Sequence, residues 1–65
     1  MLTFQEALNK LTEEYGVIDF DDSVMPGICL SCEIFEDSLE PDVYAGHCHE
    51  CGKDSLYSAL ELFFL

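Results

Sequence analysis

Four cysteines occur in two pairs with the same internal spacing, and they are the residues best suited to chemistry in this chain. Cys29 and Cys32 form the first pair, Cys48 and Cys51 form the second, and 15 residues separate the pairs. In a reducing compartment, the pattern C-x2-C-x15-C-x2-C is typical of a tetrahedral four-thiolate metal site, for which zinc is the default ion. We therefore predict a single structural Zn²⁺ bound by these four sulfurs.

Disulfide bonds are the first alternative use of the four thiols. They require an oxidising compartment, and residues 1–6 lack the basic start and apolar stretch of a secretion signal. A bond within a C-x2-C pair also closes a very small loop, which limits its entropic benefit. No apolar run approaches the roughly 18 residues of a membrane span. We expect reduced thiols in a cytoplasmic chain without membrane contact.

Two further uses of the site concern histidine ligation and catalysis. His47 and His49 flank Cys48, and either imidazole could replace a thiolate, although the four cysteines already complete the set. A four-cysteine site is closed and leaves no coordination position for water or substrate. The serine hydroxyls have only these two histidines as candidate bases. We therefore expect a protein that is not an enzyme.

Charge is the second informative property. The chain has 14 Asp and Glu residues against Lys10 and Lys53, which gives a formal charge of −12. Nucleic-acid affinity comes largely from Lys and Arg, so direct binding of DNA or RNA is disfavoured. The acidity either keeps a small protein soluble or steers it toward a protein partner with a basic surface. The candidate contacts for such a partner are Asp19, Asp21, Asp22, Glu33, Glu36, Asp37, Glu40 and Asp42.

A helix over residues 4–15 must support the metal module from the N-terminal side. Thr3 and Glu6 have the spacing of a capping box, and Gly16 stands where a left-handed residue ends a helix. Apolar residues recur at the i, i+3, i+4 and i+7 positions of one face, namely Phe4, Ala7, Leu8, Leu11 and Tyr15. We expect this stripe to pack into the core.

The metal module spans residues 28–54. Residues 17–20 are expected to be extended, and residues 21–23 and 25–27 to form turns. Short strands are expected at residues 34–35 and 43–45, with a hairpin loop marked by Asp37-Ser38 and Glu40-Pro41-Asp42. Gly52 can adopt the positive φ that points backbone N–H groups at the sulfurs, whereas Glu33 at the matching position adopts it less easily.

The C-terminal segment, residues 55–65, is expected to contribute a strand at Leu56-Tyr57 and a short helix. Ser58 and Glu61 have the spacing of a second capping box. The final residues, Leu62-Phe63-Phe64-Leu65, are strongly apolar. Either they dock on the first helix, or they form a surface for self-association or for a partner.

The two knuckles, Cys29-x2-Cys32 and Cys48-x2-Cys51-Gly52, resemble those of the zinc ribbon family. The resemblance implies a single small metal-stabilised α+β domain (residues 1–65), with two ribbon hairpins between an N-terminal amphipathic helix and a short C-terminal helix. The layout also resembles small bacteriophage-encoded ribbon proteins, which implies a host-cytoplasm location. With the acidity, it points to a nucleic-acid-mimicking modulator of a host nucleic-acid-binding protein. The alternative is a rubredoxin-like iron electron carrier, although a glycine after Cys32 and a proline after Cys48 are missing.

Overall fold

The first helix begins and ends at its capping residues. In the computed structural model, which describes residues 1–65, helix α1 spans Phe4–Tyr15. The Thr3 side chain accepts a hydrogen bond from the Glu6 N–H, and the Glu6 carboxylate accepts one from the Thr3 N–H. At the other end, Gly16 donates its N–H to the Thr12 carbonyl and has φ 75° and ψ −128°, a positive-φ conformation but not the left-handed helical one expected. The helix predicted from capping and periodicity is confirmed.

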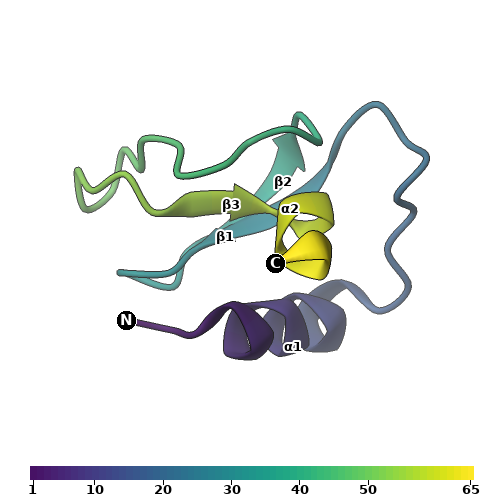
Figure 1. Ribbon diagram of the computed structural model, residues 1–65, viewed down its shortest axis with the longest axis horizontal. Helices are drawn as coiled ribbons and strands as arrows, with labels where there is room; N and C mark the ends of the chain where they lie inside the picture. Colours follow the sequence, from purple (N-terminus) through teal and green to yellow (C-terminus); the bar gives the residue numbers. More distant parts are fainter.

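A three-stranded antiparallel sheet forms the other half of the molecule (Figure 1). Its strands are β1 (Met25–Cys29), β2 (Phe35–Leu39) and β3 (Leu56–Ser58), in the order β2-β1-β3. The central strand β1 leads directly into the first cysteine pair, and β2 leaves it. The first knuckle is therefore the tip of the β1–β2 hairpin, whereas β3 reaches the opposite edge from the far end of the chain.

The expected turn at residues 25–27 is wrong, because these residues begin the central strand. The register with β2 shifts between Met25 and Gly27, and pairing with β3 starts only at Gly27. Pro26, which has no N–H to donate, thus lies at an irregularity where no ladder bond is needed. At Gly27, a Cβ atom would collide with the Leu39 side chain and the Tyr57 carbonyl. Glycine here permits the close approach of the strands.

Three other local expectations also need correction. A bend at Val17 and a turn that starts at Phe20 interrupt the extended conformation expected for residues 17–20, and Asp37 and Ser38 belong to β2, not to a loop. Residues 43–45 form no strand because Ala45 has φ 52°, which breaks the extended conformation. The backbone of this segment meets β3 through a Ser58 N–H to Val43 O bond and a Gly46–Leu56 bridge, and the Tyr44 ring packs edge-on against Tyr57, 5.2 Å between centroids.

The second helix, α2 (Ala59–Phe64), packs against α1 and the sheet. The Ser58 side chain accepts a hydrogen bond from the Glu61 N–H, but the Ser58 N–H is bonded to the Val43 carbonyl, so the expected second capping box is only half formed. Ala59 and Leu62 join a core that also contains Ala7, Leu11, Met25, Ile28, Leu30 and Tyr57. The C-terminal segment therefore docks on α1 as expected, but its last three residues are exposed.

The fold places the cysteines and the loop after α1 at opposite ends of its long axis, which measures 28 Å (Figure 1). At one end are the β1–β2 turn and the segment between the second cysteine pair and β3. At the other end, residues 16–24 connect α1 to β1. Neither helix is long and apolar enough to cross a lipid bilayer.

Candidate metal centre

The four cysteine sulfurs converge at one point. All four Sγ atoms lie within 4.8 Å of one another, and the Cys29–Cys51 and Cys32–Cys48 Sγ distances are both 3.6 Å. Four sulfurs placed tetrahedrally at about 2.3 Å from a zinc ion would be about 3.8 Å apart. A disulfide bond requires about 2.05 Å, and all four thiols are free. The cluster therefore has the dimensions of a site for one metal ion.

The two cysteine pairs lie on turns with the same hydrogen-bond pattern. In each turn, the N–H of the first cysteine is bonded to a carbonyl five residues ahead, and its carbonyl accepts the N–H four residues ahead. These bonds, 2.8–3.0 Å long, are Cys29 N to Ile34 O and Glu33 N to Cys29 O in the first turn, and Cys48 N to Lys53 O and Gly52 N to Cys48 O in the second. The two knuckles are thus built alike, although the residues around the cysteines differ.

The residue after each pair completes the turn in a left-handed conformation. Gly52 has φ 74°, as expected, and Glu33 has φ 64°. Glu33 thus adopts the conformation that was expected to be less easy for it than for glycine. The Glu33 carboxylate lies 3.6 Å from the Lys10 ammonium. This contact connects α1 to the first knuckle.

Two serines support the cluster, and sequence reasoning did not single them out. The hydroxyl of Ser55, which is buried, lies 3.2 Å from the Cys29 sulfur and 2.9 Å from the Ser31 hydroxyl. A metal-bound Cys29 is a thiolate and accepts only, so Ser55 must then turn its proton to the sulfur and accept the Ser31 proton. Ser31 lies inside the first C-x2-C pair. Ser55 immediately precedes β3, and no local sequence pattern marks it as a neighbour of Cys29.

The sulfurs differ in how readily they ionise. Burial raises the pKa of Cys29, but hydrogen bonds from the Cys32 N–H and the Ser55 hydroxyl outweigh it and lower the pKa to about 6. The Ile34 N–H lowers the pKa of Cys32, but burial and the neighbouring sulfurs raise it to about 12. The Cys29 thiolate therefore forms easily in the metal-free cluster, whereas Cys32 needs a cation to balance its charge. Metal binding should accordingly release protons.

The histidines lie outside the sulfur cluster. His47 Nδ1 is 3.2 Å from the Asp54 carboxylate, and the rings of His47 and His49 are in edge contact, 5.6 Å between centroids. Only the four cysteines form the group that can surround an ion. The geometry thus favours four thiolate ligands over a mixed histidine site.

The acidic residues proposed to contact a partner fall into separate places. Asp19 and Asp22 from the loop after α1 and Asp37 from β2 line the same hollow, which has a volume of about 250 Å³. The fold thereby joins acids from two parts of the sequence. Glu33 instead lies at the first knuckle beside Lys10. The remaining candidates, which do not line this hollow, are Asp21, Glu36, Glu40 and Asp42.

Fold and site together define a small α+β domain with a four-cysteine cluster that could hold a metal ion. Comparison of the chain with protein-family models, with curated proteins and with solved structures gives no match. The resemblance to zinc ribbons and to bacteriophage proteins therefore gains no support from these comparisons. The function must be inferred from the chain itself.

Proposed function

We propose that the four cysteines bind one structural Zn²⁺ and that this ion maintains the fold. A chain of 65 residues builds only a small core, and structural zinc can contribute on the order of 10 kcal/mol to folding. Two matched turns that direct four sulfurs to one point support this role. Iron on four thiolates has the same tetrahedral arrangement. Elemental analysis distinguishes the two ions, and ferric iron would give a red protein.

We propose further that this metal-stabilised domain is a non-enzymatic module that binds a protein partner with a basic surface. The supporting observation is the separation of the two features: the four sulfurs form a closed cluster, and carboxylates from the loop after α1 and from β2 line a hollow that includes none of the cysteines. Figure 1 shows the β1–β2 turn and the loop after α1 at opposite ends of the molecule. A closed cluster supports structure but offers no open position for a reaction. The narrower form of the proposal is a nucleic-acid mimic that occupies the basic surface of a nucleic-acid-binding protein.

The metal can be tested first, with the purified chain. Stripping the metal with a chelator should abolish the folded circular dichroism spectrum, and one equivalent of Zn²⁺ should restore it. Cys48→Ser removes a buried ligand and should prevent this recovery, whereas Ser38→Ala at an exposed position should not affect it. A chain that stays folded after complete stripping would refute the structural role of the ion.

The partner can then be sought by affinity capture from the cells that contain the protein, using metal-loaded and stripped chains in parallel. Any recovered protein should be purified and its dissociation constant measured directly at several salt concentrations. We expect binding only by the metal-loaded chain, with affinity falling steeply as salt rises. Salt-independent binding would contradict the electrostatic part of the proposal, and equal binding by the stripped chain would contradict the role of the metal.

A further inference from the structure

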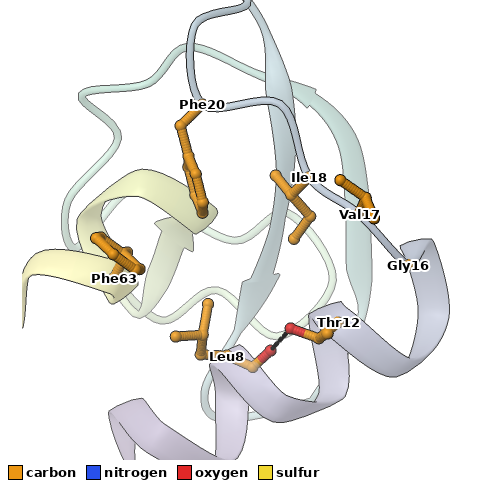
Figure 2. A pocket seen from close by; sticks show the side chains of 7 residues that line it. All are labelled: Leu8, Thr12, Gly16, Val17, Ile18, Phe20 and Phe63. Atoms are coloured by element: carbon orange, nitrogen blue, oxygen red, sulfur yellow. Dashed lines mark hydrogen bonds between the residues drawn. The ribbon is translucent and has the colours of Figure 1, made fainter.

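An apolar groove lies between α1, the loop after it, and α2. It has a volume of about 440 Å³. Figure 2 shows the side chains of Leu8, Ile18, Phe20 and Phe63 around it. The one hydroxyl in its wall, on Thr12, donates a hydrogen bond to the Leu8 carbonyl at 2.9 Å. The groove therefore offers contact to an apolar side chain and no free polar group to orient a polar ligand.

The groove adjoins the acidic hollow described above. Val17 and Ile18 line both depressions, and the Val17 side chain is 100% exposed. On the acidic side stand the carboxylates of Asp19, Asp22 and Asp37. An occupant of the groove would thus place its neighbouring residues beside three negative charges.

The rim contains no cation to neutralise these carboxylates. Lys10 lies beside Glu33 at the first knuckle, and Lys53 follows the second cysteine pair. A second copy of this chain would bring another charge of −12 to the same surface. Charge thus opposes self-association here and favours a cationic occupant. Exposure of Phe63 at 58% leaves one wall of the groove open to such a partner.

We propose that the groove and the acidic hollow together bind one segment of a partner protein, which inserts a large apolar side chain into the groove and places Lys or Arg side chains against Asp19, Asp22 and Asp37. This inference rests on the proposed function and specifies the partner and the surface. Apolar burial would supply most of the affinity, and the carboxylates would select a basic segment and speed its association.

The test uses the metal-loaded full chain and a synthetic 14-residue amphipathic helical peptide with leucines on one face and lysines on the other. Two matched peptides serve as controls, one with the leucines replaced by alanine and one with the lysines replaced by glutamine. Binding is followed by chemical-shift changes of the backbone amides and by fluorescence anisotropy. We expect only the first peptide to bind well, with the largest shifts in residues 8–20, in residue 37 and in α2.

Substitutions at exposed positions then distinguish binding at this surface from attraction by the overall charge of the chain. Val17→Ser should weaken binding of the peptide about tenfold, because a fully exposed valine is buried in the complex. The triple variant D19N/D22N/D37N should weaken it by roughly tenfold as well. Asparagine keeps the side-chain oxygens at positions 19 and 22 that accept hydrogen bonds from the Asp21 and Ser23 N–H groups. The control triple variant E40Q/D42N/E50Q has the same net charge and should bind like the original chain.

The outcomes of these experiments distinguish failure of the proposed binding surface from failure of the proposed function. Equal loss in both triple variants, or shifts scattered over all acidic residues, would overturn the proposed surface by showing binding through overall charge alone. Normal binding by Val17→Ser would overturn the role of the groove. If a partner captured as described above binds the Val17→Ser and D19N/D22N/D37N variants unchanged, this surface is wrong but the proposed function stands. If neither that search nor the peptide gives binding, both fail.

Discussion

Glu33 and Gly52 have nearly the same backbone conformation, with φ 64° and 74°, although one carries a long charged side chain and the other has none. Each follows the second cysteine of its pair and donates its N–H to the carbonyl of the first cysteine. The left-handed conformation is therefore imposed by the turn that presents the sulfurs. The first knuckle has the same geometry as the second without a glycine.

This relationship predicts that glycine is more stable than alanine at both positions. Gly52→Ala should lower the free energy of unfolding by about 1 kcal/mol, because a Cβ there meets nothing within 4 Å and the cost is one of backbone conformation alone. At position 33, Glu33→Gly should be about 1 kcal/mol more stable than Glu33→Ala. Both alanine and glycine remove the Lys10 contact, so this pair is matched. Urea unfolding of the zinc-loaded chain measures the differences.

Ser55→Ala should weaken metal binding about tenfold, since supporting hydrogen bonds to ligands typically have effects of this size. The substitution removes the hydroxyl that lies 3.2 Å from the Cys29 sulfur and 2.9 Å from Ser31. Competition with a chromophoric chelator measures the affinity. Ser38→Ala, the same change at an exposed site, is the control. Unchanged affinity in Ser55→Ala would mean that the hydroxyl has no influence on the bound ion.

Gly27→Ala should reduce stability by about 3 kcal/mol, the upper part of the range for overpacking, because the new methyl group would meet the Leu39 side chain and the Tyr57 backbone together. The flexible side chain can move, but the carbonyl is fixed by the sheet. Gly52→Ala is a useful comparison: it adds the same methyl group in open space at positive φ, and should cost only about 1 kcal/mol. Thermal unfolding that ranked the two variants equally would contradict the packing explanation.

Neutralising Asp37 should lower the pKa of Tyr15. Burial raises this pKa above the usual value of 10.0, and the charges of Asp37, Glu14 and Glu36 raise it further. Because the folded-state pKa is the higher one, the stabilising contribution is complete below pH 10 and is lost as the pH rises through the folded-state value. NMR titration of the Tyr15 ring should show a lower pKa in Asp37→Asn and no change in Asp42→Asn. Identical titration curves in all three proteins would place Asp37 away from the ring.

Features with a local cause could be predicted from the sequence, and features made by distant contacts could not. The bounds of α1 followed from Thr3, Glu6 and Gly16, whose effects act within one helical turn. The strand through Pro26 and Gly27 was missed because both residues usually mark turns. Only the bulge opposite β2 and the crowding by Leu39 explain why they lie in the central strand.

The candidate metal centre and the acidic hollow show the same contrast between local and distant causes. Regular spacing identified the four cysteines, and the structure brings their sulfurs together. Ser55 was missed because its contact with Cys29 spans 26 residues, and a serine carries no signal for such a partner. The acidic hollow, which is lined by Asp19, Asp22 and Asp37, likewise depends on how the loop after α1 lies beside β2. Local sequence patterns do not specify that arrangement.

The distance between the sulfur cluster and the groove has a practical consequence. A four-thiolate site accepts Co²⁺ as well as Zn²⁺, and Co²⁺ is paramagnetic. Because the cysteines lie at the opposite end of the chain's long axis from the loop after α1 and none of them lines the groove, a cobalt-loaded chain would carry a built-in magnetic reference outside the groove. The paramagnetic shifts it induces in a bound peptide would report how far, and in which direction, the peptide lies from the ion.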